Sequence, residues 1–457
     1  MSFIGHTPEE EARMLAEAGI GRFEELLEQI PEPLRLKGLP DLPPSQSEAE
    51  IRRTFGVLAG RNYDPQKTVS FLGAGVYDHA IPSAVDHLAL RSEFYTAYTP
   101  YQAEVAQGTL AAIFEFQTMT CELTGLDAAN ASMYDGASAA AEALLLARGA
   151  TRASRILISP CVNPRIREVV QMYHAHGDVL IESLPEDEGR VDLAALRAAL
   201  ATADPPIAAV LVQQPNFFGL VEPLDEIGAI VSDGEGRRPH LVVSADPISL
   251  GILGPPASWG AETVVGDLQP LGIPAQFGGP SAGYFATRRA HIRRMPGRIA
   301  AETTDGEGRR GFTLTLQTRE QHIRREKATS NICTNSALVA LRATIHLSLL
   351  GPRGLRQVAE QCLHRAHYAL QRLTAIPQVT RRYPGPFFRE FVIVLPCPAA
   401  PVIERLYAEH GILGGVPLSR FVAERENELL VAVTEQRTSE DIDRLAECLG
   451  RVLGEDA

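Results

Sequence analysis

The stretch from Val264 to Pro280 reads Val-Val-Gly-Asp-Leu-Gln-Pro-Leu-Gly-Ile-Pro-Ala-Gln-Phe-Gly-Gly-Pro. Its β-branched start leads into a segment rich in glycine and proline, and a second apolar run, Gly283–Thr287, follows at once. β-Branched and aromatic residues favour strands, whereas glycine and proline mark turns. The stretch therefore predicts a loop held between two strands.

Strand-like runs and helix-like segments alternate on the N-terminal side of this loop. The helix-like segments begin near Asn163, Asp192 and Pro223. The strand-like runs are 155–159, 179–183, 207–213, 241–245 and 263–265. This alternation predicts an α/β fold with a mostly parallel sheet that helices cover on both faces. Ligands of such sheets bind at the carboxyl ends of the strands.

Gln269 occupies a position in the loop that decides what chemistry the chain can perform. In pyridoxal-phosphate (PLP) enzymes of the aspartate-aminotransferase type, a loop of this kind carries the lysine that holds the cofactor as a Schiff base. An amide nitrogen is not nucleophilic, so Gln269 cannot make that bond. The chain has only three lysines, Lys37, Lys67 and Lys327. A self-contained PLP enzyme such as an aminotransferase or a desulfurase needs a lysine after the 263–265 strand, and none is there.

Composition narrows the class of protein further. The chain has 457 residues, a net charge of −13 and 45% apolar residues, which is typical of a globular protein with a large core. The acidic balance argues against nucleic acid or an anionic membrane as partner. No apolar run reaches the roughly 18 residues of a membrane span, and the N-terminus does not resemble a secretory leader, so we expect a cytoplasmic protein.

The six cysteines are scattered, without a Cys-x-x-Cys pair or a histidine tract. This pattern predicts reduced thiols, and neither a metal site nor a disulfide framework. They are Cys121, Cys161, Cys333, Cys362, Cys397 and Cys448.

Residues 1–62 predict an N-terminal helical arm. Thr7 and Glu10 form a capping-box pattern with Pro8 at the first helical position, and the helical pattern continues from Ala12 to Ile30. Five prolines follow within 31–44, and Ser47 with Glu50 starts a second helix that runs through Leu58. Such helices suit either an arm laid over something other than the chain's own core or a small helical cap on that core.

The rest of the chain predicts two further domains. Residues 63–330 form the large domain, with an irregular segment at its start, an apolar helix over 108–123 and a compact helix over 138–147. Residues 331–457 begin with a long helix from Asn335 to Leu373. Two strands follow, 387–395 and 428–434, each with a helix after it, which suits a small α+β domain.

Two features suit a cofactor site at the carboxyl edge of the sheet. Asp135, Gly136 and Ser138 lie at a turn that opens a helix, where free backbone N–H groups could hold a phosphate. Ordinary helix capping explains the same residues. Asp246 follows a buried strand, where a carboxylate could keep the PLP ring nitrogen protonated. A turn-forming aspartate before Pro247 is the alternative.

Three polar stretches lie outside this edge. Residues 95–104 read Tyr-Thr-Ala-Tyr-Thr-Pro-Tyr-Gln-Ala-Glu, a composition that is costly to bury unless it faces water or a polar ligand. Residues 319–331 predict a solvated helical face or, alternatively, the rim of a polar pocket. The five arginines of 288–298 predict a solvated basic turn or a contact for an acidic partner.

Four separated motifs, in one order, resemble the P-protein of the glycine cleavage system, and the resemblance runs from about Thr7 to the last helix. They are residues 95–104; Asn-Ala-Ser-Met-Tyr-Asp-Gly at 130–136; Gly-Ile-Pro at 272–274 with Phe-Gly-Gly-Pro at 277–280; and Arg-Arg-Glu-Lys-Ala-Thr-Ser-Asn-Ile-Cys-Thr at 324–334.

The resemblance implies a division of labour between two chains. Some members of that family are split into two subunits, and the half with a His-Lys-Thr turn holds PLP. This chain, with Leu268-Gln269-Pro270 there, resembles the other half, subunit 1 or alpha. A beta partner in a heterotetramer of two alpha and two beta subunits is implied. So is the reaction: glycine loses carbon dioxide, and its aminomethyl group passes to the oxidised lipoyl arm of H-protein, with T-protein and L-protein as further members of the system.

The resemblance also implies roles for individual residues. The tyrosine-rich loop is expected to border the glycine and PLP pocket of the partner. Its residues are Tyr95, Tyr98, Thr99, Tyr101, Gln102 and Glu104. A degenerate cofactor site is expected at Asp135, Gly136, Ser138, Asp246 and Gln269. Lys327 is interpreted as an anchoring residue, because it follows a charged helical run instead of a strand. A scaffold subunit that only stabilises its partner or docks H-protein fits the same sequence.

Overall fold

The computed structural model describes residues 5–38, 40–62, 68–96, 98–202, 205–233, 238–276 and 278–455. Lys67, and the motif positions Ala97 and Phe277, lie outside these residues. The chain divides into two compact units, Met1–Asp64 and Pro65–Ala457. The three-part division at 62 and 330 stays a prediction.

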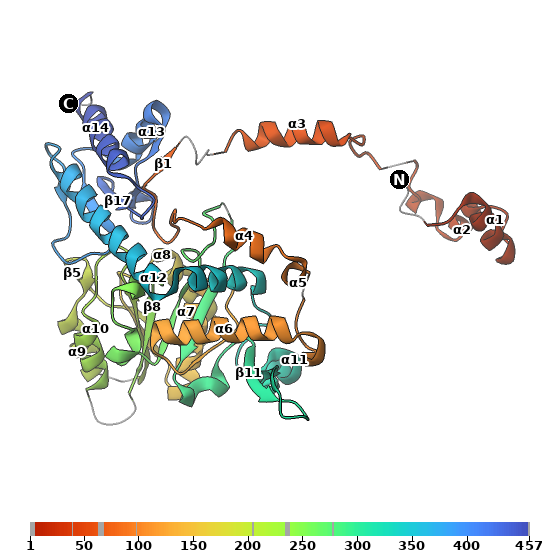
Figure 1. Ribbon diagram of the computed structural model, residues 1–457, viewed down its shortest axis with the longest axis horizontal. Coiled ribbons are helices and arrows are strands. Elements are labelled where there is room, and N and C mark those ends of the chain that lie inside the picture. The colour runs from red at the N-terminus through yellow and green to blue at the C-terminus, as the bar shows by residue number, and fades with distance from the viewer. Residues whose placement is uncertain are drawn as a thin grey trace. The chain divides into compact units, whose positions relative to one another are not determined.

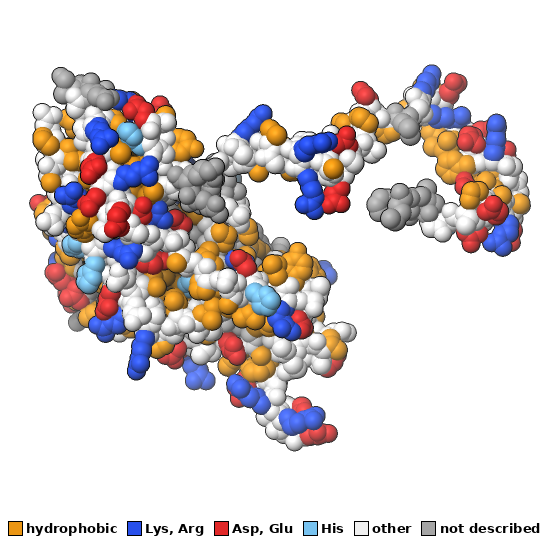
Figure 2. Space-filling model, turned by 45° about the horizontal axis from the view of Figure 1, so that its top comes forward, with side chains coloured by type: hydrophobic (Ala, Val, Ile, Leu, Met, Phe, Trp, Pro, Cys, Tyr) orange, Lys and Arg blue, Asp and Glu red, His pale blue; other side chains and the backbone are white. Residues whose placement is uncertain are grey.

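The first unit contains helices α1 (Pro8–Glu17), α2 (Phe23–Leu26) and α3 (Glu48–Ala59). The predicted capping boxes at Thr7 and Ser47 are both present. The single helix predicted over Ala12–Ile30 is wrong, because the chain turns after α1 at Gly19, whose φ of +73° lies in the left-handed region. None of the described residues of these helices is buried, and apolar side chains are exposed along the unit (Figure 2).

A seven-stranded sheet organises the second unit (Figure 1). Its strands, in spatial order, are β2 (Ala128–Ala129), β10 (Gly283–Thr287), β9 (Thr263–Asp267), β8 (His240–Ala245), β7 (Ile207–Gln214), β3 (Arg155–Ile158) and β4 (Leu180–Ser183). β9, β8, β7, β3 and β4 pair in parallel, and β10 pairs antiparallel with β9 and β2. The predicted mostly parallel sheet is confirmed, and so is the loop between two strands at β9 and β10.

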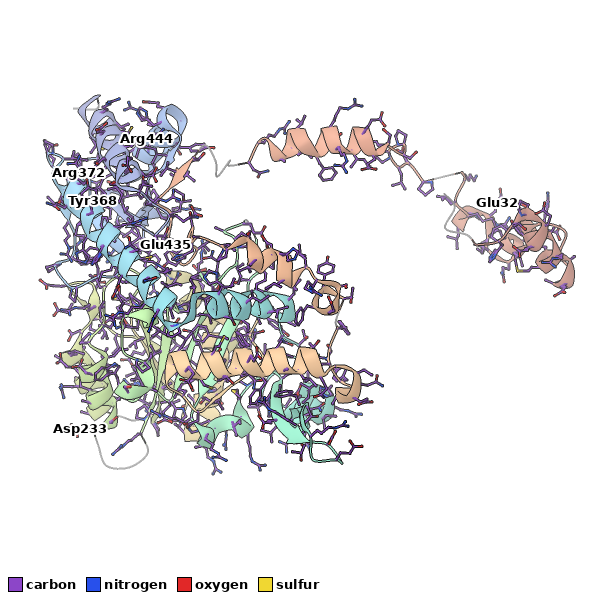
Figure 3. All side chains as sticks on the ribbon, viewed as in Figure 1. Glu32, Asp233, Tyr368, Arg372, Glu435 and Arg444 are labelled. Carbon is purple, nitrogen blue, oxygen red and sulfur yellow. The ribbon has the colours of Figure 1, made fainter. Side chains whose placement is uncertain are left out.

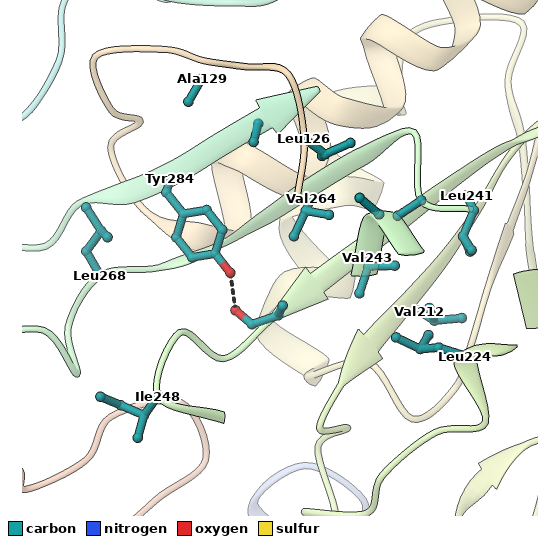
Figure 4. Close-up of a cluster of buried hydrophobic side chains, with 14 of the residues drawn as sticks. Leu126, Ala129, Val212, Leu224, Leu241, Val243, Ile248, Val264, Leu268 and Tyr284 are labelled. Atoms are coloured by element: carbon teal, nitrogen blue, oxygen red, sulfur yellow. Dashed lines mark hydrogen bonds between the residues drawn. The ribbon is translucent and has the colours of Figure 1, made fainter. Parts of the chain in front are cut away.

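Both faces of this sheet are buried, as the nearly unbroken apolar strands predict. Val243 and Val264 contribute to one hydrophobic cluster, and their chain neighbours Val242 and Val265 contribute to another on the opposite face. Figure 4 shows part of the first cluster, where the Tyr284 hydroxyl donates to the Ala245 carbonyl at 2.6 Å. Burying such side chains stabilises the fold by roughly 1.5–3 kcal/mol each.

Helices on the two faces complete the layers. α7 (Gly136–Thr151) and α8 (Pro164–His174) pack on one face, and on the other face lie α6 (Gln107–Thr124), α9 (Leu193–Ala201), α10 (Leu224–Ser232) and the start of α12 (Ala337–Thr374). The helices predicted to begin at Asn163, Asp192 and Pro223 begin one residue later, because those residues are the N-caps. The fold class predicted from the alternation is thus present in three dimensions.

A second, antiparallel sheet forms the C-terminal part. Its order is β13 (Thr380–Arg381), β14 (Glu390–Val394), β17 (Glu428–Ala432) and β16 (Val416–Pro417), with α13 (Ala399–His410) and α14 (Ser439–Glu455) packed on it. Asp443 on α14 accepts hydrogen bonds from the Tyr368 hydroxyl at 2.7 Å and the Arg372 Nε at 2.6 Å. These bonds connect α14 to α12. Figure 3 labels Tyr368 and Arg372 on α12 and Arg444 on α14.

Smaller elements complete the second unit. They are β1 (Val69–Ser70), parallel to β15 (Ile412–Leu413); β5 (Glu186–Asp187) with β6 (Arg190–Val191); and the hairpin of β11 (Ile299–Thr304) and β12 (Arg310–Thr315). Among the described residues, no helix is long and apolar enough to cross a membrane.

Three local predictions need correction. The long helix after Asn335 is two helices, because Gly351 has φ +59° and Pro352 cannot donate a backbone hydrogen bond. The segment expected to be irregular before Tyr101 contains α4 (Ser83–Ala89) and α5 (Ser92–Tyr95). The helical face expected over 319–331 is wrong, because only α11 (Gln321–Arg324) and short 3-10 turns form there.

Candidate functional site

A cavity of about 290 Å³ lies where the sequence predicts ligand binding, beyond the carboxyl ends of β7, β8 and β9. Of the five residues predicted to form a degenerate cofactor site, Asp135, Gly136 and Asp246 line it. The loop before α4, the start of α8 and strand β14 complete its wall. The charged residues on the wall are Asp135, Arg165, Asp246, Asp267, Arg389 and Glu390.

Gln269 does not line the cavity, and its side chain connects two segments. Its Nε2 donates to the carbonyls of Tyr77 at 2.9 Å and Ile273 at 3.0 Å, and its Oε1 accepts from the Tyr77 backbone N–H at 2.8 Å. The side chain is buried, so this pairing satisfies polar groups that have no water to bind. A lysine has no acceptor and cannot replace it.

The start of α7 already holds a carboxylate from the chain itself. The Gly136 backbone N–H donates to Asp267 Oδ2 at 3.1 Å, and the Ser138 N–H donates to Asp135 Oδ1 at 2.7 Å. Ser138 therefore acts as part of a capping box and not as a phosphate ligand. A Cβ on Gly136 would lie 2.9 Å from the Asp267 backbone nitrogen, so only glycine allows this approach.

Asp267 is held rigidly in that place. It also accepts from the Gln269 N–H at 2.9 Å and the Ser281 hydroxyl at 3.0 Å. Burial raises the pKa of the Asp267 carboxyl, while these hydrogen bonds favour its charged form. A phosphate group at the same helix start would meet two carboxylates, those of Asp267 and Asp135, and would be repelled.

Asp246 is also engaged. Its Oδ1 accepts from the backbone N–H groups of Ile248 and Ser249, and its Oδ2 pairs with Arg389, which is 2% exposed. The guanidinium carbon of Arg389 lies 3.5 Å from the centre of the Tyr77 ring. A buried cation thus balances the carboxylate that would otherwise keep the PLP ring nitrogen protonated. The residues of this cavity therefore do not fit PLP at any of three places: the position of the lysine, the phosphate site and the site of the ring nitrogen.

Glu390 forms the deep wall of the cavity. Its Oε2 accepts from the Tyr77 hydroxyl at 2.6 Å and its Oε1 from the Ala74 N–H at 2.7 Å. Burial raises the pKa of Glu390 to about 7 and raises the pKa of Tyr77 well above its usual value. This pair was missed because residues from the start and the end of the unit meet only in the folded chain.

The scattered cysteines predict no metal site, yet the structure brings three potential ligands together. The donor atoms of His79, Cys362 and Glu435 lie within 4.8 Å of one another. His79 Nδ1 and Glu435 Oε2 are 2.7 Å apart, and the Cys362 thiol lies 3.4 Å from the same oxygen. Arg389 contacts the other ring nitrogen of His79. Its positive charge disfavours a metal cation, and the cluster is best described as a hydrogen-bonded network.

The tyrosine-rich loop lies outside the cavity. Tyr98 is 89% exposed, Tyr95 59% and Tyr101 55%. Thr99 is half-buried, Gln102 and Glu104 are exposed, and none of the six residues lines the cavity. Tyr95 and Tyr98 border a second, smaller hollow of about 70 Å³ over α6 and α12. Large exposed phenols of this kind mark a surface for a partner.

The basic segments are not uniform surfaces. Lys327 is exposed in a 3-10 turn and does not line the cavity. Arg293 and Arg294 are exposed, but Arg298 is 3% exposed, so the prediction of one solvated basic turn over 288–298 is wrong at its end. Arg298 donates to Thr334, Asn335 and Tyr101, which connects the tyrosine-rich loop to the start of β11.

Comparison with known proteins identifies the family. A family model described as glycine cleavage system P-protein matches residues 1–449. A protein of Carboxydothermus hydrogenoformans, named probable glycine dehydrogenase (decarboxylating) subunit 1, is 50% identical over 450 residues, which are 98% of this chain and 99% of the relative. A Moorella thermoacetica protein of the same name is 50% identical over 453 residues, 99% of this chain and 100% of its own.

Solved structures agree. A crystal structure of glycine decarboxylase (P-protein) of the glycine cleavage system, in inhibitor-bound form, is 43% identical with a TM-score of 0.87, over 99% of this chain and 100% of that one. Glutamate decarboxylase of Lactobacillus brevis has a TM-score of 0.69 at 12% identity, over 95% and 97% of the two chains, and shows the fold alone. The predicted aspartate-aminotransferase type of fold is confirmed. The chain belongs to the glycine cleavage system P-protein family.

Proposed function

We propose that this chain is the PLP-free alpha subunit, or subunit 1, of a two-subunit glycine decarboxylase. A beta subunit holds PLP, and the pair decarboxylates glycine and transfers the aminomethyl group to the oxidised lipoyl arm of H-protein. The assembly is a heterotetramer of two alpha and two beta subunits in the cytoplasm, and it works with T-protein and L-protein. The relatives named subunit 1 support the division into two chains.

The observation that supports the proposal best is the state of the chain's own cavity. Gln269 is a structural clamp, Asp267 occupies the helix start, and Arg389 neutralises Asp246. PLP supplies an electron sink for the carbanion that decarboxylation creates. With this cavity unable to hold it, the cofactor belongs on the partner, and the chain is inactive alone.

This chain's contribution comes from the tyrosine-rich loop at the partner's pocket. The exposed phenols of Tyr95, Tyr98 and Tyr101 and the polar side chains of Thr99 and Gln102 bind and orient glycine at the partner's cofactor. Glu104, an exposed carboxylate, adds a group that can hold a proton there. Enclosing the substrate between two chains excludes water, which strengthens the polar interactions that orient it.

The alternative is a scaffold subunit that stabilises its partner or docks H-protein without entering the active site. Glycine–bicarbonate exchange measured with this chain, with the partner and with both distinguishes the two. Activity only in the mixture supports the proposal, and full activity of the partner alone supports the scaffold. A lasting internal-aldimine absorbance band of the purified chain after dialysis would contradict both, since the chain would then hold PLP itself.

A further inference from the structure

Arg298 is a buried cation without a carboxylate partner among the described residues. Its Nη1 donates to Thr334 Oγ1 at 2.7 Å and to Asn335 Oδ1 at 3.4 Å, and its Nη2 donates to the Tyr101 hydroxyl at 3.1 Å. All three acceptors are neutral, and within the described part of the chain Arg298 Nε has no hydrogen-bond partner. The guanidinium carbon lies 5.4 Å from the centre of the Tyr101 ring.

Arg298 differs in its partners from the other arginines that are buried among the described residues. The other buried arginines pair with acids: Arg389 with Asp246, Arg155 with Glu182, and Arg437 with Asp78. A buried charge is unfavourable unless it is paired, so a guanidinium that stands among neutral groups favours an anion nearby.

Two of the residues that accept hydrogen bonds from Arg298 carry hydroxyl groups and are exposed at the surface. The Tyr101 oxygen accepts from Arg298, so the phenolic hydrogen is left to donate elsewhere, and the same holds for the Thr334 hydroxyl. Tyr101 and Thr334 are both exposed. Two hydroxyl donors that are both hydrogen-bonded to one cation are suited to bind a carboxylate or phosphate oxygen.

We propose that Tyr101 and Thr334, held by Arg298, form a receptor for an oxyanion presented by the partner's active site. The oxyanion is the carboxylate of glycine or the phosphate of PLP, which share this chemistry. Tyr101 and Thr334 donate to it directly, and Arg298 is a positioning residue that supplies charge from behind. The inference rests on the proposed function, since the ligand lies on the partner.

The test uses the reconstituted two-subunit enzyme and the variants Tyr101→Phe, Thr334→Val, Arg298→Met and Arg298→Lys. The control is Arg310→Met, because Arg310 is an exposed arginine of the β11–β12 hairpin that follows Arg298, and it pairs with Glu302. Glycine KM and the PLP dissociation constant are measured for each pair. If the ligand is the carboxylate of glycine, the glycine KM of the variants should be at least fivefold higher than that of the wild-type pair, with PLP affinity unchanged. A phosphate ligand predicts at least fivefold weaker PLP binding with KM unchanged at saturating PLP.

Thermal unfolding of the chain alone separates this role from a structural one. Removing an unpaired buried cation in Arg298→Met is expected to leave Tm unchanged or higher, and Arg298→Lys is expected to recover part of the lost binding. If neither the glycine KM nor the PLP dissociation constant changes in any of the four variants, the inference is wrong, even if Tm falls. In that case glycine exchange by the wild-type pair, and a lower rate of exchange in Tyr98→Phe, still support the proposed function. An inactive wild-type pair would contradict both.

Discussion

The backbone N–H of Gly136 donates to the Asp267 carboxylate across 3.1 Å, so the helix start that would bind a phosphate is filled by a side chain of the same protein. The two residues lie on different elements, the first turn of α7 and the last residue of β9. Their contact means that restoring the missing lysine would not restore a PLP site.

Gln269→Lys is therefore expected to give a chain that does not bind PLP. It is also expected to lower the free energy of unfolding by about 1–3 kcal/mol, because the Tyr77 backbone groups lose their partner in a buried place. Absorbance titration with PLP and urea unfolding check the two effects. Gln276→Lys, an exposed substitution in the same loop, is the matched control and should change neither. Stable PLP binding by the single variant would contradict the role given to Asp267.

Glu390 is expected to make stability depend on pH. Burial raises its folded pKa to about 7, whereas the unfolded value is near 4.5. Between these values the folded chain binds more protons than the unfolded chain, so this contribution to stability is full below pH 4.5 and is lost as pH rises to 7. Glu390→Gln removes the titration and can still bind Ala74 and Tyr77.

The difference in unfolding free energy between wild type and Glu390→Gln, measured by urea titration at pH 5 and pH 8, isolates this group. Glu142 and Glu222 also have pKa values raised by burial to about 7, but they titrate in both proteins. We expect the variant to gain relative stability at pH 8 over pH 5. A difference that is the same at both pH values would mean that Glu390 does not titrate in this range.

The tyrosine-rich loop is expected to matter for activity and not for folding. Tyr98→Phe and Glu104→Gln should each lower glycine decarboxylation by the pair by roughly tenfold or more, the scale on which lost positioning and proton transfer act. Their exposure predicts an unchanged Tm of the chain alone. Tyr407→Phe, at an exposed tyrosine of α13, is the control. Wild-type rates in both loop variants would remove the loop from the active site.

The exposed apolar side chains of the first unit allow a test of whether the N-terminal arm covers the partner or the chain's own core. Phe55 is 65% exposed and Val57 is 63% exposed, although both are apolar. If the arm lies over the partner, replacing both with serine should weaken assembly of the pair in sedimentation while the Tm of the chain alone is unchanged. A lower Tm of the chain alone with normal assembly would instead support a cap on its own core.

The exposed arginines Arg293 and Arg294 allow a test of whether the segment 288–298 contacts a partner, with H-protein as the candidate. Arg293→Glu with Arg294→Glu should raise the KM for H-protein, with glycine kinetics intact, because charge reversal acts mainly on association. Higher salt should produce the same trend in the wild type. Arg353→Glu, at an exposed position of α12, is the control. An unchanged KM would leave this segment as a solvated turn.

Part of this protein could be predicted from its sequence. The strands at 155–158, 207–214 and 240–245, and the helix starts marked by Asn163 and Asp192, follow from hydrophobic runs and caps, which are local signals. Where a local signal conflicted with backbone geometry, as at Gly19 and Gly351, the predicted helices were too long. That position 269 holds glutamine and not lysine is read directly from the sequence.

What the tertiary structure decided is which side chains meet. Hydrophobic periodicity says which face of a strand is buried, but it does not say that Asp267 fills the start of α7, that Arg389 neutralises Asp246, or that Arg298 is buried behind Tyr101. These pairs join elements far apart in the chain, and their energies depend on burial and distance, which only the folded topology sets. The sequence by itself thus determined that no lysine stands at position 269, and the fold decided that Gln269, Asp267 and Arg389 are engaged by the chain's own groups.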